Sequence, residues 1–142
     1  MQNLNQRAAQ FVVGKALDLV QEKYAGRALS VAVCDRNGFL LAFARCDEAK
    51  LLTIELTQRK AYTAARTGVQ TQAFLQRLQQ ENLNIAYFGD EQFSALPGGI
   101  PVFDADKRLL GAVAIGGISA KEDQEAAEIL VAALTDQLHN FS

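Results

Sequence analysis

The spacing of apolar residues along the chain predicts several amphipathic helices. Over residues 4–24, apolar side chains recur every three or four positions in two adjacent rows, which is typical of a helix with a broad buried face. Gly26 follows these rows and predicts where the helix ends. Ser119 and Glu122 have the spacing of a capping box at the start of a last helix. The other helices are expected over residues 51–67, 70–80 and 119–138.

A β-hairpin is expected over residues 29–35 and 39–45, where apolar residues flank an Asn37-Gly38 pair. Asn-Gly favours a two-residue type I′ turn, which would pair Cys34 with Leu41. In that register neither face of the hairpin is polar, so both faces should be covered, by helices or by a partner subunit. We therefore expect these two strands to be central in their sheet.

A second hairpin is expected over residues 100–103 and 109–115. Pro101 cannot donate a hydrogen bond to a neighbouring strand, so it marks an edge or a bulge. The preceding stretch is harder to interpret, and residues 85–88 are expected to form a short strand. Hairpins between helices indicate an antiparallel sheet in an α+β domain, and no linker divides residues 1–142 into two domains.

Composition and charge exclude several function classes. With 142 residues, 49% of them hydrophobic, the chain can bury one sizeable core. The net charge of -2 is spread along the chain, so we expect no nucleic acid partner. No apolar run approaches the roughly 20 residues of a membrane-spanning helix, and the N-terminus lacks a signal-peptide pattern. The sequence therefore favours a cytoplasmic protein that contacts neither membrane nor nucleic acid.

Few residues of the chain carry familiar catalytic or metal-binding chemistry. Cys34 and Cys46 would lie too far apart along the hairpin for a disulfide, so both are expected as buried thiols. His139 is the only histidine and is explained by its place near the end of the last helix. No metal-ligand spacing, dinucleotide fingerprint or phosphate-binding loop is present. We therefore predict no metal site and no catalytic residues.

The helix over residues 51–67 has an unusual polar row, in which Thr53, Lys60, Thr63 and Thr67 recur at helical spacing. Threonine is a mediocre helix former, so several in one row indicate that their hydroxyls serve a purpose. A lysine among them can bind a carboxylate or a phosphate. The alternative is that Lys60 lies at the margin of the helix and extends into water.

Two glycine pairs are the second candidate for ligand binding. Gly98 and Gly99 precede one strand, and Gly116 and Gly117 precede the last helix. Paired glycines expose backbone N–H groups and allow an anionic ligand to approach the main chain, and a helix N-terminus favours anions. The alternative for the first pair is an ordinary strand entry after a tight turn.

Five segments of the chain together form a specific pattern, although each is a weak signal alone. They are Val33-Cys34-Asp35 with Gly38, Arg45 and Asp47; Arg59-Lys60-Ala61-Tyr62-Thr63-Ala64-Ala65; Pro97-Gly98-Gly99-Ile100-Pro101; Leu110-Gly111-Ala112-Val113; and Ala120-Lys121-Glu122-Asp123. In order and spacing these segments resemble the GlcG/HbpS-like family, which includes the C-terminal domain of PduO-type corrinoid adenosyltransferases. The similarity extends from about residue 4 to residue 138.

The resemblance implies a profilin-like α+β fold and homo-oligomers, built from dimers and often octameric. It also implies a non-enzymatic ligand-binding or accessory protein, with haem or a corrinoid as cofactor. Within the family pattern, Lys60, Thr63, Gly98 and Gly99 occupy the matching positions. The axial histidine that some haem-binding relatives carry on the first helix is absent here. Two alternatives remain: an enzyme that acts on a small hydroxy acid or aldehyde, with Lys60 as anion anchor or base, and a purely structural interaction module.

Overall fold

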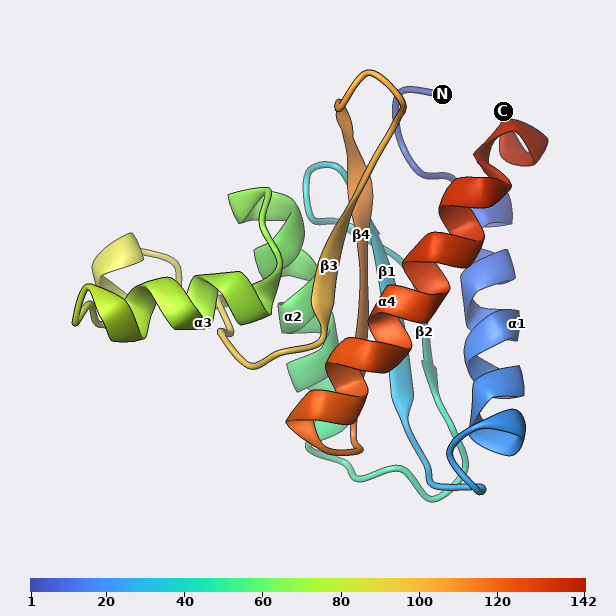
Figure 1. Ribbon diagram of the computed structural model, residues 1–142, viewed down its shortest axis with the longest axis horizontal. Helices are drawn as coiled ribbons and strands as arrows, with labels where there is room; N and C mark the ends of the chain where they lie inside the picture. The colour runs from blue at the N-terminus through green and yellow to red at the C-terminus, as the bar shows by residue number, and fades with distance from the viewer.

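The computed structural model describes residues 1–142 and contains a four-stranded antiparallel sheet with helices on both faces (Figure 1). Its elements follow in the order α1 (Gln6–Glu22), β1 (Ser30–Asp35), β2 (Leu40–Arg45), α2 (Thr53–Thr67), α3 (Thr71–Gln80), the 3-10 helix η1 (Ile85–Phe88), β3 (Gly99–Phe103), β4 (Leu109–Gly116), α4 (Ala120–Asp136) and the 3-10 helix η2 (Leu138–Phe141). The α+β class predicted from the sequence is confirmed. No helix combines the length and the apolar character needed to cross a bilayer.

The strands lie in the order β2-β1-β4-β3, and all neighbouring pairs are antiparallel. Helices α1 and α4 cover one face of the sheet, and α2 crosses the other. Helix α3 projects away from the sheet and contacts only α2 and β3 closely (Figure 1). The prediction that both faces of the first hairpin are covered holds for β1, which helices cover on both sides, whereas β2 is only partly covered.

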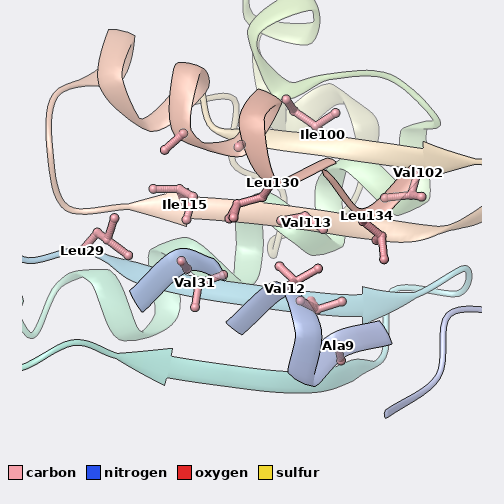
Figure 2. Packing of buried hydrophobic residues seen from close by; sticks show 14 of the residues in the cluster. Ala9, Val12, Leu29, Val31, Ile100, Val102, Val113, Ile115, Leu130 and Leu134 are labelled. Carbon is pink, nitrogen blue, oxygen red and sulfur yellow. The ribbon is translucent and has the colours of Figure 1, made fainter. Parts of the chain in front are cut away.

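The larger core lies between the sheet and the α1/α4 layer. Leu130 and Leu134 of α4 and Val12 of α1 pack on Val31 and Val113 of the two central strands (Figure 2). All five side chains are almost fully buried. The two apolar rows predicted for the first helix explain this arrangement, because they provide a face wide enough to cover half of the sheet.

The opposite core, beneath α2, is built from small residues. Ala61, Ala64 and Ala65 of α2 pack against Cys34 and the alanines of β1 and β4. Small side chains on both surfaces allow the helix to approach the sheet closely. This close approach determines where the polar row of α2 lies.

The first hairpin departs from the predicted geometry. Its register follows the prediction from Ser30–Arg45 to Val33–Ala42, but a bulge then pairs Cys34 with Leu40. The loop has three residues, because the backbone N–H of Asp35 donates to the carbonyl of Phe39. The bulge moves Leu41 to the α1/α4 side of the sheet. In addition, β1 is central as predicted, but β2 is an edge strand.

The second hairpin lies where the sequence predicts it, and β3 is the other edge of the sheet, consistent with Pro101. The strand predicted over residues 85–88 is wrong, because these residues form the 3-10 helix η1. The side chain of Asn84 caps η1 by accepting a hydrogen bond from the N–H of Ala86. This local bond stabilises a helical turn. The apolar run is too short for its periodicity to distinguish a helix from a strand.

Candidate functional site

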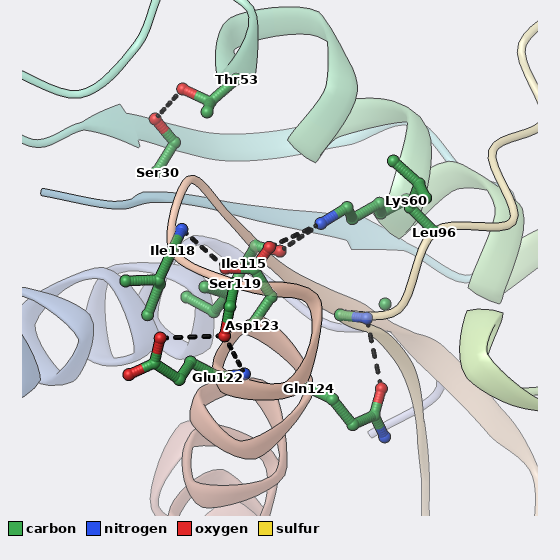
Figure 3. A network of polar contacts seen from close by, with 12 residues as sticks. Ser30, Thr53, Lys60, Leu96, Ile115, Ile118, Ser119, Glu122, Asp123 and Gln124 are labelled. Carbon is green, nitrogen blue, oxygen red and sulfur yellow. Dashed lines mark hydrogen bonds and ion pairs between the residues drawn. The ribbon is translucent and has the colours of Figure 1, made fainter. Parts of the chain in front are cut away.

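Lys60 lies inside the protein rather than at its surface. Only 1% of the residue is exposed, although it sits on a helix with solvent on its outer side. Its ammonium donates to the carbonyl of Ile115, 3.0 Å away, and to Oδ2 of Asp123, 3.1 Å away (Figure 3). Asp123 is itself 5% exposed, and its Oδ1 accepts from the N–H of Ile118. The pair joins α2 to the end of β4 and the first turn of α4.

Burial dominates the electrostatics of this pair. Desolvation lowers the pKa of Lys60, and the attraction and hydrogen bond from Asp123 offset only part of that effect. Desolvation likewise raises the pKa of Asp123, against the opposing attraction of Lys60. Both shifts disfavour the charged forms. A proton therefore moves from the ammonium to the carboxylate more easily here than it would in water.

A small pocket of about 180 Å³ opens beside this pair, and we call it the lysine pocket. Lys60, Asp123 and Thr53 contribute the polar part of its lining, and Gly117 contributes main chain. The remaining lining residues come from the segment before α2, from α2 itself, from the segment before β3 and from the start of α4. They are apolar except for Lys50: Lys50, Leu52, Leu56, Leu96, Pro97, Ile118 and Ala120. Three of the eight sequence-predicted site residues, Thr53, Lys60 and Gly117, thus meet at one cavity.

No open gap separates Lys60 from the first glycine pair, because these residues are in contact. A Cβ atom added at Gly98 would lie 3.2 Å from Nζ of Lys60, and one at Gly99 would overlap the carbonyl of Lys60. The N–H groups of both glycines are already engaged, by Gln124 and by Thr71. Both glycines therefore permit close packing of α2 on β3.

The other predicted residues also bond within the protein. Thr63 and Thr67 donate their hydroxyls to backbone carbonyls one turn earlier in α2, and Thr63 also accepts from the N–H of Ser94. Gly116 pairs with Ser30 across the sheet, and a Cβ atom at this position would overlap Oγ1 of Thr57. Thr63, Thr67 and Gly116 therefore do not line the lysine pocket.

A larger hollow of about 550 Å³ lies between the first hairpin and α2, and we call it the hairpin pocket. Phe39 and Leu40 line it and are 65% and 50% exposed, so these neighbouring side chains form an apolar wall that is open to solvent. Facing residues of α2 include Arg59, Tyr62 and Arg66. The volume lies within the range of about 300–1,000 Å³ that is typical of small-molecule sites.

The polar groups of the hairpin pocket are held in place by specific contacts. The hydroxyl of Tyr62 donates to Asp90, which raises the pKa of the phenol. The guanidinium of Arg66 lies 5.0 Å from the centre of the Tyr62 ring, and its Nε donates to the carbonyl of Asn37. Cys34, at the base of the pocket, donates to the carbonyl of Ala61, and burial raises the pKa of its thiol to about 12. This thiol is therefore a poor nucleophile and a poor metal ligand.

One sequence pattern pointed to the hairpin pocket, but a helix face exposed to solvent explained the same pattern equally well. Arg59, Tyr62 and Arg66 recur at spacings of three and four, so they lie on one face of α2. Only the structure brings the exposed Phe39 and Leu40 opposite them. Asp123 was missed as a site residue because its position in the first turn of α4 already explained an acidic side chain.

Comparison with known proteins identifies relatives over most of the chain. Residues 4–132 match the family described as "Haem degrading protein HbpS-like". Protein GlcG of Escherichia coli K12 is 29% identical over 112 residues, which cover 79% of this chain and 80% of GlcG.

Two solved structures are similar along nearly their full length. A double mutant of Streptomyces reticuli HbpS has a TM-score of 0.82 and 28% identity, covering 94% of this chain and 88% of its own. A complex of PduOC with haem has a TM-score of 0.79 at 22% identity, covering 92% and 94%, and so shares the fold. The match over residues 4–132, which takes in both candidate pockets, shows that the chain belongs to the HbpS-like family.

Proposed function

We propose that the protein is an accessory protein that binds a tetrapyrrole, with haem as the favoured ligand, in the hairpin pocket. The observation that carries the proposal is the pairing of an exposed apolar wall, Phe39 and Leu40, with two arginines of α2, Arg59 and Arg66. Haem has an apolar macrocycle and two carboxylates at one edge, so it requires this combination. Membership of the HbpS-like family and the haem complex of PduOC support the same ligand class.

The residues of the pocket fit the parts of haem one by one. Phe39 and Leu40 provide apolar surface for the macrocycle, and burying them on binding is favourable. Arg59 and Arg66 provide forked donors for the propionates. Arg59 currently contacts Glu55 at 3.5 Å, in an exposed pair that is weak and can be exchanged for a ligand carboxylate.

Tyr62 is the residue of the pocket suited to contact the iron. Tyrosine is an established haem ligand, and no histidine lines the hairpin pocket. Asp90 orients the phenol oxygen through this hydrogen bond and is placed to accept the phenol proton when the oxygen binds iron. When bound, the haem would supply its redox-active iron, and the chain would hold and orient it.

A titration of the purified protein with haemin, followed by its Soret band, tests the proposal. We expect the wild type to bind haemin in a saturable one-to-one transition. The Soret maximum of the complex should lie at a different wavelength in Tyr62→Phe. Replacing Arg59 and Arg66 by glutamine should weaken binding about ten- to a hundredfold per arginine, because each loses a charge-assisted hydrogen bond of about 1.5–3 kcal/mol. His139→Ala is the matched control, since His139 lies in η2, outside the hairpin pocket.

Two outcomes would overturn the proposal. One is a linear haemin response like that of free haemin, and the other is binding that His139→Ala abolishes and Tyr62→Phe leaves unchanged. Diaquocobinamide, a corrinoid without the nucleotide phosphate, separates haem from corrinoids in a parallel titration. The corrin periphery carries neutral amides instead of carboxylates, so the arginine variants should leave any corrinoid affinity unaltered.

A further inference from the structure

The lysine pocket contains a group that haem binding does not use. Five of the six lysines are exposed, and Lys60 is the one that is buried. Its ammonium lies between Asp123 and Ile115, and Lys60 and Asp123 both line the pocket (Figure 3). Leu52 and Leu96, 71% and 49% exposed, form an apolar rim. The cavity thus has an apolar entrance and an amine–carboxylate pair on its wall.

This arrangement matches the needs of amine chemistry more closely than those of anion binding. The carboxylate of Asp123 neutralises the charge that would attract an anionic ligand. By contrast, a lysine becomes nucleophilic when it is desolvated and can lose its proton to a nearby base. Burial lowers the pKa of Lys60 and raises the pKa of Asp123, so both shifts favour that proton transfer.

We propose that the lysine pocket captures a small aldehyde or ketone as a Schiff base on Lys60, with Asp123 as the proton carrier. The volume of about 180 Å³ limits the substrate to a few heavy atoms, since pockets for drug-sized ligands begin at about 300 Å³. Among the other lining residues only Lys50 carries a charge, and the apolar rim of Leu52 and Leu96 favours a small carbonyl compound. This site is separate from the hairpin pocket and does not depend on haem binding.

The proposed step balances with the two side chains alone. The ammonium of Lys60 gives one proton to the carboxylate of Asp123, and the free amine attacks the carbonyl carbon. A C–N bond forms, the C=O π electrons move to oxygen, and Asp123 returns a proton to that oxygen. Asp123 then takes a second proton from the nitrogen and passes it to the hydroxyl, which leaves as water. The products are a protonated imine on Lys60, a carboxylate on Asp123 and one molecule of water, with no oxidant or reductant required.

Reductive trapping tests the proposal directly. The folded protein is incubated at neutral pH with acetaldehyde and cyanoborohydride, and each lysine is scored by peptide mass spectrometry for the added ethyl group. We expect Lys60 to be labelled at least about tenfold faster than the five exposed lysines, as an activated amine should be. A bulky naphthaldehyde should reverse this order, because it reacts with exposed lysines but does not enter the pocket.

Two variants separate a reactive pocket from a purely structural ion pair. Ala120→Leu narrows the lysine pocket without touching the pair, so it should protect Lys60 from acetaldehyde. Ala105→Leu, at an exposed position in the β3–β4 loop, is the matched control and should leave the labelling of Lys60 unchanged. Asp123→Asn should slow labelling, and circular dichroism with a thermal melt establishes that each variant is folded.

The proposal is overturned if Lys60 stays unlabelled in the folded wild type while the exposed lysines react. It is also overturned if Ala120→Leu and Ala105→Leu label alike, because Lys60 would then react through unfolding rather than through the pocket. Neither result depends on haemin. Failure of this proposal is therefore distinguishable from failure of haem binding, which the Soret titration reports.

Discussion

Replacing Lys60 by methionine keeps most of the bulk of the side chain but leaves Asp123 as an unpaired charge inside the protein. The two side chains are only 2% and 7% exposed, so water cannot take the place of the missing partner. Removing one member of such a pair typically costs about 3–5 kcal/mol. We expect Lys60→Met to lower the free energy of unfolding by that amount. Asp123→Asn should cost less, because its one amide oxygen can still accept one of the two hydrogen bonds, and the ammonium of Lys60 keeps its bond to the carbonyl of Ile115.

The double variant Lys60→Met/Asp123→Asn carries the argument, since it removes both charges together. A neutral pair of similar volume is often as stable as a buried ion pair. The free energy of unfolding of the double variant should therefore lie within about 2 kcal/mol of the wild-type value and should exceed that of Lys60→Met alone. Urea unfolding followed by circular dichroism measures all four proteins. Simple additivity of the two single effects, or a cost of Lys60→Met below about 1 kcal/mol, would refute the reasoning.

The pH dependence of the same four proteins provides a second measurement. Because the pKa of Asp123 is raised, the folded state binds more protons than the unfolded state at pH values just above the ordinary carboxyl range. The stability that this protonation contributes is present at low pH and is lost as the pH rises through the raised pKa. Because the pKa of Lys60 is lowered, the folded state binds fewer protons than the unfolded state just below the ordinary amine range. The stability that the neutral amine contributes is present at alkaline pH and is lost as the pH falls through the lowered pKa. Relative to the double variant, the wild type should gain stability toward both acid and alkaline pH.

Two further predictions concern packing and thiol reactivity. Gly99→Ala should destabilise the protein by about 1–3 kcal/mol, because the new methyl group overlaps the carbonyl of Lys60, whereas Gly14→Ala should stabilise it by about 0.5–1 kcal/mol, because nothing lies near Gly14 on the exposed face of α1. Urea unfolding of both variants checks this, and a neutral Gly99→Ala would contradict the close contact. Cys34, with its pKa raised to about 12, should react with a disulfide reagent at pH 8 more slowly than Cys46 in the folded protein and equally fast in urea. Rapid labelling of Cys34 before unfolding would show that its burial is wrong.

The sequence predicted most of the fold because periodicity and turn residues act locally. Helix boundaries fall within about two residues of the expected ones, and the hairpin register holds as far as Val33. The prediction failed at Cys34, because a three-residue loop with a bulge competes closely with the expected two-residue turn. The bulge turns the side chain of Leu41 to the opposite face of the sheet, where it packs against the α1/α4 core.

The candidate sites were harder to predict because they depend on contacts between distant segments. Lys60 and Asp123 are 63 positions apart, and no local pattern indicates that the side chain of Lys60 reaches the first turn of α4. The threonine row was recognised, but Thr63 and Thr67 bond to their own helix, which a wheel of side chains does not reveal. Phe39 was assigned to a covered face, whereas the edge position of β2 leaves it exposed beside the hairpin pocket.

The two edges of the sheet differ in their capacity to recruit another strand. At β3, Pro101 offers no donor, and the N–H of Gly99 is already bonded to Thr71. A strand approaching from that side would find few backbone groups to pair with. At β2 there is no proline, and exposed apolar residues lie alongside. Lateral association through the sheet, in ordered assembly or in aggregation, is therefore directed to the β2 edge.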